Sequence, residues 1–317
     1  MTEKHQNVFT DPETAKKIAQ LENSPEMQNR LQQVKADMKT KTFNPLSVRF
    51  IVMVILVMSL LRTTYYPLLF VAIAWWVFTN PNDKNQTDLD ESYVNNFLSP
   101  LLQTVFPGTT LNYLEGFDRG FYDCILPKSH RCSSSCHITF ADKYKTEFTN
   151  MQSWHYERHN TKKSIKVTDF YGQVFLVRLP TKVKGRLRIV PVIGKRWGNS
   201  KAHGRYGDRE KDEVEIQTES LEFNDAYSIF STDEFYARLI LDPNVITILN
   251  NWAQKMPISL YVAGEYIVLG FDSGRWLFST PTSRKAIEDI SIANEYEKVR
   301  KLLADFYDLI DIFIEKA

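Results

Sequence analysis

One apolar stretch of this chain reads Leu46-Ser-Val-Arg-Phe-Ile-Val-Met-Val-Ile-Leu-Val-Met-Ser-Leu-Leu61, then Arg62-Thr-Thr64, then Tyr65-Tyr-Pro-Leu-Leu-Phe-Val-Ala-Ile-Ala-Trp-Trp-Val-Phe78. Each apolar half would form a helix about 25 Å long, close to the thickness of about 30 Å of the hydrocarbon core of a bilayer. One continuous span would place Arg62 at the bilayer centre, at a cost of about 3 kcal/mol. We therefore predict a two-helix transmembrane hairpin over residues 46–79, with Arg62 at the far surface.

Other residues of this stretch fit a hairpin. Pro67 would lie in the first turn of the second helix, where its missing N–H costs nothing. Aromatic side chains that favour membrane–water interfaces lie near the helix ends, namely Tyr65, Tyr66, Trp75 and Trp76. The alternative is a buried helical hairpin in a soluble protein, which we disfavour because such helices should show polar faces.

The distribution of charge predicts the orientation of the hairpin. The segment before it is rich in cations, namely Lys4, Lys16, Lys17, Arg30, Lys35, Lys39 and Lys41, whereas the connecting loop has only Arg62. The positive-inside rule then places the N-terminus and the main domain in the cytoplasm. We expect no signal peptide, because the first apolar run starts late and no small-residue cleavage site follows it. Three cysteines, an odd number, suit a reducing compartment.

The remaining chain divides into four parts. Residues 1–45 are polar and predict two helices, which start at Thr10-Asp-Pro-Glu13 and after Pro25. Residues 80–91 are a linker that begins Asn80-Pro-Asn-Asp. Residues 92–281 form the main domain, since 43% hydrophobic residues suffice to fill a core. Residues 282–317 form an amphipathic helix.

The main domain shows the pattern of an α+β fold. Apolar spacing predicts a helix from Ser92 to Val105, and a capped helix opens at Asp242-Pro243. Short apolar runs predict strands at 173–177, 187–192, 214–216, 226–230, 258–262 and 266–271. We interpret Val262-Ala-Gly-Glu-Tyr266 as a hairpin turn. This order predicts an antiparallel sheet with helices packed on one face.

The last segment, Ser283 to Lys316, predicts one long helix with a continuous apolar seam. The seam steps by four and three residues through Ile292, Tyr296, Val299, Leu303, Phe306, Ile310 and Phe313. Such a helix packs either on its own chain or on a partner, which is a second copy or another protein.

The main domain also resembles a known family. Phe170-Tyr-Gly-Gln-Val-Phe175, Leu221-Glu-Phe-Asn-Asp-Ala-Tyr-Ser-Ile-Phe-Ser-Thr-Asp233 and Ala237-Arg-Leu-Ile-Leu-Asp-Pro243 are similar to the bacterial domain-of-unknown-function family numbered 3137, as is Leu98-Ser-Pro-Leu-Leu…Phe106-Pro-Gly. The resemblance covers about residues 90–280. It implies a bacterial cell membrane protein with two membrane helices before a cytosolic domain, and it implies no activity and no catalytic residue.

Two groups of residues could carry chemistry. The first is a run of thiols and imidazoles that includes Cys124, Cys132, Cys136 and His137, which offers enough ligands for tetrahedral zinc but lacks the paired spacing of common zinc sites. Cysteines without a metal ligand role are the other interpretation. The second is His155-Tyr-Glu-Arg-His159, which lacks the Glu-after-His pattern of zinc hydrolases. We interpret the residues around it as a polar loop or a hairpin turn.

A basic tract is the remaining candidate. No acidic residue lies between Phe170 and Gly207, and a Gly-rich loop within the tract carries Lys195, Arg196, Trp197, Lys201 and Arg205. Near a membrane, each such cation is worth about 1 kcal/mol with anionic lipid. No motif for nucleic-acid recognition accompanies these charges, which disfavours nucleic acid as the partner. A solvated loop without a partner is the alternative.

The sequence contains no phosphate-binding glycine loop, no serine elbow and no convincing pair of carboxylates. We therefore expect a non-catalytic, membrane-anchored interaction or scaffold module without a cofactor. The alternative is a metal- or thiol-dependent protein that uses residues 124–137.

Overall fold

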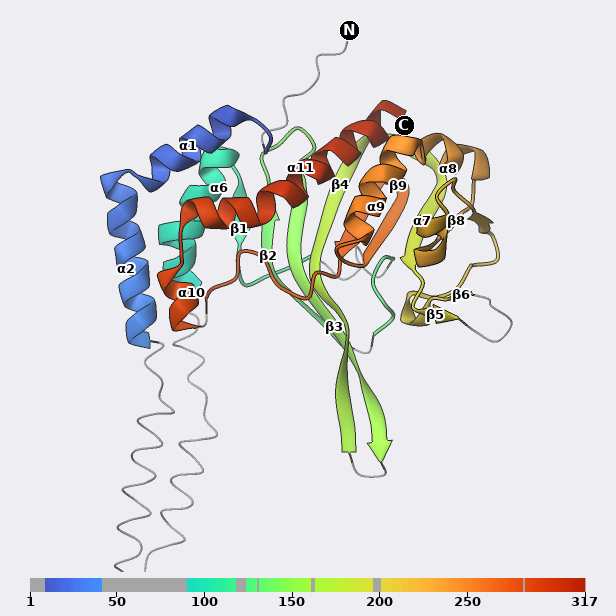
Figure 1. The fold of residues 1–317 in the computed structure, drawn as a ribbon, viewed down its shortest axis with the longest axis horizontal. Helices are drawn as coiled ribbons and strands as arrows, with labels where there is room; N and C mark the ends of the chain where they lie inside the picture. The colour runs from blue at the N-terminus through green and yellow to red at the C-terminus, as the bar shows by residue number, and fades with distance from the viewer. Residues whose placement is uncertain are drawn as a thin grey trace, which may run out of the picture. The chain divides into compact units, whose positions relative to one another are not determined.

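The computed structural model describes residues 9–41, 90–117, 124–129, 131–160, 163–195, 201–281 and 283–316 (Figure 1). The predicted hairpin over 46–79 lies outside these residues. Among the helices that the structure does describe, none is long and apolar enough to cross a membrane. The chain forms two compact units, one of Met1–Lys17, Leu102–Ser279 and Tyr296–Ala317, the other of Ile18–Leu101 and Thr280–Glu295.

The first unit is built on an antiparallel β-sheet with helices, which confirms the α+β prediction. Its sheet has the order β1-β2-β3-β4-β8-β7, and β9 also pairs with β4. All the pairings are antiparallel. The strands are β1 (Thr110–Asn112), β2 (Arg131–Thr139), β3 (Glu147–Asn160), β4 (Lys163–Pro191), β7 (Val214–Ile216), β8 (Tyr227–Ser231) and β9 (Ile258–Phe271), and the short pair β5 (Gly194–Lys195) and β6 (Lys201–Ala202) stands apart.

Strand β4 joins two strands that the sequence pattern separates. The predicted strands at 173–177 and 187–192 lie on one strand, which pairs with β9 on one side and with β3 and then β8 on the other. Between Arg178 and Arg186 the register with β9 jumps twice, so this part of β4 bulges out of the ladder. Pro180, Lys182 and Lys184 resemble a loop in sequence because they lie in that bulge.

Strand β9 corrects the predicted hairpin turn at 262–266. The chain continues through Gly264 as one strand, and Gly264 takes a positive φ of 57°. Tyr261 and Tyr266 pack against the same apolar cluster although they are five positions apart, an offset that would place them on opposite faces of a regular strand. The alternation of side chains between the two faces of β9 is therefore interrupted at Gly264. The glycine marks an irregularity within the strand and not a turn between two strands.

Helices cover one face of the sheet. They are α7 (Leu221–Ala226), α8 (Glu234–Ile240), α9 (Pro243–Ala253) and α11 (Ile292–Lys316). Ser220, Asp233 and Asp242 cap α7, α8 and α9 by accepting a hydrogen bond from a backbone N–H of the first turn. Trp252 of α9 packs on Phe271 at 5.0 Å between ring centroids, and Phe306 of α11 packs on Phe175 at 4.7 Å.

A second apolar layer covers the opposite face of the sheet. There Phe117, Ile125 and Leu126 pack against Met151, Phe170, Val174, Leu176 and Val268, and all of these side chains are buried. The two layers make the core of the first unit, and the long strands β4 and β9 pass between them.

The second unit is helical. It contains α2 (Pro25–Lys41), α10 (Arg284–Glu288) and the π-helical turn η1 (Val94–Leu98), with parts of α1 (Pro12–Glu22), α6 (Ser99–Val105) and α11. The Lys35 Nζ donates to the Glu288 carbonyl, and the Ser92 hydroxyl donates to Asp37. The starts predicted for α1 and α2 are confirmed.

The predicted single helix from Ser283 to Lys316 is wrong in its first third. Helix α10 ends at Glu288, and α11 begins only at Ile292. The Ser291 hydroxyl accepts from the Asn294 N–H at 3.2 Å and thereby caps a new helix. A serine inside an amphipathic pattern is easily interpreted as helical, but here it starts a helix.

Candidate functional site: the polar clusters beside strand β4

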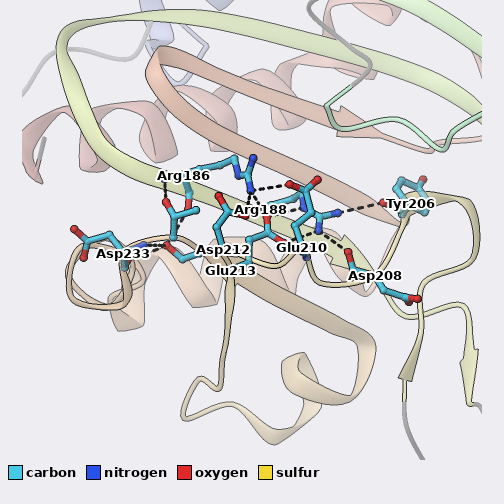
Figure 2. A network of polar contacts seen from close by, with 10 residues as sticks. Arg186, Arg188, Tyr206, Asp208, Glu210, Asp212, Glu213 and Asp233 are labelled. Carbon is cyan, nitrogen blue, oxygen red and sulfur yellow. Dashed lines mark hydrogen bonds and ion pairs between the residues drawn. The ribbon is translucent and has the colours of Figure 1, made fainter.

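The strongest polar network surrounds Arg188, which projects from β4 on the face away from the helices (Figure 2). Its guanidinium donates to both carboxylate oxygens of Glu213, at 3.2 and 2.8 Å. It also donates to the carbonyls of Tyr206 and Asp208, at 3.2 and 2.9 Å. Phe230 lies against the guanidinium at 5.0 Å from its centroid. The side chains of Arg188 and Glu213 are only 8% and 0% exposed, so this is a buried, bidentate ion pair.

Glu213 is held as a carboxylate in this network. Burial by itself would raise its pKa, but the hydrogen bonds from Arg188 and from the Glu210 N–H, with the charges of Arg188 and Arg186, lower the pKa below its ordinary value. The Glu210 N–H donates to the Glu213 Oε2 at 2.8 Å. The segment before β7 is thereby fastened to β4.

The network extends through Arg186 to the start of α8. The Arg186 Nη2 pairs with Glu210 at 2.8 Å and with Asp212 at 3.1 Å. The backbone of Arg186 exchanges hydrogen bonds with Thr232, and the Ser231 hydroxyl donates to its carbonyl at 2.8 Å. Asp233, which follows Thr232 in the chain, caps α8 (Figure 2). The cluster thus joins β4, the loop before β7 and the first turn of α8.

A second cluster lies where β3 and β4 leave the sheet. His155 Nδ1 lies 2.7 Å from Asp169 Oδ1, and His155 Nε2 lies 3.1 Å from Glu157 Oε1. The Ser129 hydroxyl donates to Asp169 Oδ2 at 2.5 Å, and Arg205 Nε lies 3.5 Å from Asp169 Oδ1. The side chains of His155 and Asp169 are 7% and 8% exposed.

These residue types suggest a Ser-His-Asp triad, but the geometry does not. In such a triad the histidine bonds to the serine and activates it. Here Ser129 donates to the carboxylate of Asp169, and both ring nitrogens of His155 face carboxylates. The cluster therefore orients and fastens chain segments and does not activate a nucleophile.

Of the two interpretations of the sequence around 155–159, the polar loop is wrong and the hairpin is supported, because β3 pairs with β4 as far as Asn160 and Lys163. Residues 155–159 themselves belong to β3, and His155 is buried. Strand alternation would have shown it, because Met151, Ser153 and His155 occupy alternate positions and are all buried. Asp169 could not be matched to His155 from sequence, since the strand register brings them together.

We expect the His155 cluster to stabilise the fold most below neutral pH. Hydrogen bonds to Asp169 and Glu157 raise the His155 pKa above 6.5. Its contribution is therefore complete below pH 6.5 and is lost as the pH rises through the folded-state pKa. Between about pH 6 and about pH 8, the urea midpoint of the wild type should fall relative to that of His155→Gln. Asp169→Asn should reduce this difference, and an equal pH slope in wild type and His155→Gln would contradict the assignment.

The residues of the predicted anion-binding loop are only partly described. Lys201 Nζ lies 3.5 Å from Glu215 Oε1, and Arg205 pairs with Asp169. Arg196, Trp197 and the side chain of Lys195 lie outside the described residues. Several described cations of the basic tract lie near acids of distant segments, since Arg178 and Lys182 also lie 3.9 and 3.7 Å from Glu147 and Glu265.

The cysteines of the proposed zinc site occupy separate settings. Cys124 and Cys132 pack against the apolar layer that covers the face of the sheet opposite the helices. Cys136 is buried at a bulge in β2, and burial raises the pKa of its thiol. His137 Nε2 pairs with Glu147 at 3.0 Å. Within the ranges that the structure describes, no three Cys, His, Asp or Glu side chains are arranged to hold a metal ion.

The apolar seam of α11 is buried. All seven residues of the seam, Ile292, Tyr296, Val299, Leu303, Phe306, Ile310 and Phe313, are at most 3% exposed. Tyr296 stacks on Phe9, and Phe306 packs on Phe175 of β4. These contacts favour the first alternative, in which the helix packs on its own chain, and they leave the seam no exposed docking surface.

Similarity to known proteins is confined to part of the chain. Among curated proteins, none matches the chain significantly. A crystal structure of the mycobacterial trehalose monomycolate transport factor A, TtfA, aligns over 68% of this chain and 92% of that chain, with 10% identity and a TM-score of 0.36, which does not establish a shared fold. The predicted resemblance to family 3137 is supported by a family model described as a protein of unknown function (DUF3137), which matches residues 168–314. The match starts later than the predicted range of 90–280 and includes most of α11.

Proposed function

We propose that this chain is a non-catalytic interaction module, which the hairpin 46–79 anchors in a bacterial cell membrane with the described domain on the cytoplasmic side. The membrane part of the proposal rests on the hydropathy and charge of residues 1–79. The non-catalytic part is supported by the polar clusters, whose charged groups bond to one another and to the backbone of the same chain.

The proposal rests on one contrast. The charged groups of the polar clusters are paired within the chain, whereas two large apolar side chains on α7 and α8 are exposed to solvent. Phe235 on α8 is 81% exposed, and Leu221 on α7 is 80% exposed. Large apolar side chains on a rigid surface are typical of residues that bind a partner protein. The Arg186 network holds the first turn of α8 through Thr232 and Asp233, so it fixes the backbone that presents Phe235.

The experiment examines anchoring and assembly in one preparation. We expect the full chain to stay in the membrane fraction after alkaline carbonate extraction, and Val54→Asp with Val57→Asp to release it, because each acid costs about 3 kcal/mol within a membrane helix. In mild detergent the wild-type chain should migrate as an assembly larger than one chain, and Phe235→Ser should shift it to the single chain.

Leu114→Ser is the matched control, since Leu114 is 66% exposed but lies after β1, away from α8. It should leave the assembly intact. Release of the wild-type chain by carbonate would refute the anchor. A single chain for the wild type, or one assembly for wild type and Phe235→Ser alike, would refute binding through α8.

A further inference from the structure

Strands β3 and β4 extend beyond the sheet as a two-stranded arm. The pairing of β2 with β3 ends at Trp154, and the pairing of β9 with β4 begins at Gln173. Beyond these points His155–Asn160 pairs only with Lys163–Val167 among the described strands. Figure 1 shows this ribbon projecting well past the other strands of its sheet. A two-stranded ribbon by itself is marginally stable in water, so a projecting one calls for a second stabilising element.

One such element is the His155 cluster at the root of the arm. His155 lies on β3 and Asp169 on β4, so their contact crosses from strand to strand, while Glu157 contacts His155 from within β3. Arg205 and Ser129 reach the same carboxylate from two other segments. The arm therefore leaves the sheet in a fixed direction, and only its outer part depends on further contacts.

The two faces of the arm differ in chemistry. Directly paired residues share a face, so the register places Trp154, Tyr156, Arg158, Ser164, Lys166 and Thr168 on one face. This face, which we call the aromatic–basic face, carries no acidic residue. His155, Glu157, Ile165 and Val167 lie on the other face.

The cations of the aromatic–basic face are exposed to solvent. Lys166 Nζ lies 4.1 Å from the centroid of the Trp154 ring, and Tyr156 is 49% exposed. Arg158 and Lys166 are exposed, and neither forms an ion pair with another described residue. This contrasts with Arg186 and Arg188 of β4, whose cations pair with acids of the segment before β7.

We infer that the aromatic–basic face of the β3–β4 arm docks on the anionic phospholipid headgroups of the membrane. Tryptophan and tyrosine have an apolar ring with a polar edge and favour the headgroup layer, and the cations pair with phosphates. The membrane is the partner that the charges favour, because a chain anchored through 46–79 would be tethered to a polyanionic surface. The inference rests on the proposed function, in which the anchor holds the chain at the lipid.

The test uses the full chain reconstituted into lipid nanodiscs, either of phosphatidylcholine alone or of an equimolar mixture with phosphatidylglycerol. Hydrogen–deuterium exchange of the amides in residues 154–168 is measured in both. We expect exchange to slow at least about fivefold in the anionic discs, since docking suppresses fraying of the arm and each cation contributes about that factor. High salt should remove the effect.

Arg158→Glu with Lys166→Glu should abolish the lipid-dependent protection, whereas Arg158→Lys with Lys166→Arg should retain it. The control Lys255→Glu with Lys285→Glu makes the same change in net charge at two other exposed lysines and should behave as the wild type. Equal exchange in the two lipids overturns the inference, as does protection that survives Arg158→Glu with Lys166→Glu. Stronger protection by an added RNA oligonucleotide in neutral discs would assign the face to nucleic acid instead. Co-elution of the chain with the discs reports the anchor separately, so loss of the anchor is distinguished from loss of arm docking.

Discussion

Glu213→Leu should lower the free energy of unfolding by about 3–5 kcal/mol, because it leaves the guanidinium of Arg188 buried without its counter-ion. Arg188 is 8% exposed and Glu213 is fully buried, so water cannot replace the lost carboxylate. The loss should appear as a lower urea midpoint of the full chain in detergent, with an unchanged dependence of the free energy on urea concentration.

Three comparisons make this result specific. Arg188→Met with Glu213→Leu should be more stable than Glu213→Leu alone, because the unpaired charge is gone. Glu234→Gln breaks the ion pair of Glu234 with Arg238, whose side chains are both 55% exposed, and should cost at most about 0.5 kcal/mol.

The stabilisation by Glu213 should also depend on pH. Because its pKa is low, its contribution is present above pH 4.5 and is lost as the pH falls through the folded-state pKa. The difference in unfolding free energy between wild type and Glu213→Leu should therefore narrow in acid. An effect of Glu213→Leu as small as that of Glu234→Gln would show that the ion pair is not buried in solution.

Phe306→Ala should also destabilise the chain by about 3–5 kcal/mol, because it removes a buried ring and leaves a cavity between α11 and the sheet. Phe306 has 0% exposure and packs on Phe175 at 4.7 Å between centroids. Thermal unfolding followed by circular dichroism measures the loss.

Phe235→Ala is the matched control for this prediction. Phe235 is 81% exposed, so its removal should change the free energy of unfolding by no more than about 0.5 kcal/mol. If Phe306→Ala proved as mild as Phe235→Ala, α11 would be detached from the sheet in solution, and its apolar seam would be available to a partner. The pair of variants thus separates a core helix from a docking helix.

The α+β architecture could be predicted because it follows from short-range patterns. Apolar alternation marks the strands, and the side chains of Asp242 and Ser220 meet the backbone N–H groups of the next turn. Two of the errors in the fold arose where one local signal has two structural meanings. Gly264 permits a positive φ in a turn or in a bulge, and Ser291 is compatible with a continuing helix or with a new cap.

The candidate site could be predicted only in part. The sequence shows a basic tract on residues 170–207, but it does not show that Arg188 meets Glu213 or that Arg205 meets Asp169. The seam of α11 is visible as a pattern, yet whether it packs on its own sheet or on a partner cannot be determined from periodicity. Each of these questions concerns contacts between residues far apart in the chain.

From sequence alone come the two apolar runs at 46–79, from which a hairpin is predicted, the antiparallel α+β domain, the cap at Asp242 and the α11 seam, because hydropathy, periodicity and capping act between residues a few positions apart. Tertiary structure decided which charges are buried and which are displayed. The fold joins Arg188 to Glu213 and buries His155 beside Asp169, while it leaves Arg158 and Lys166 exposed on the projecting arm. The physical reason is that strand register and chain crossings set the distance and the solvation of a charge, and the energy of an ion pair depends on both.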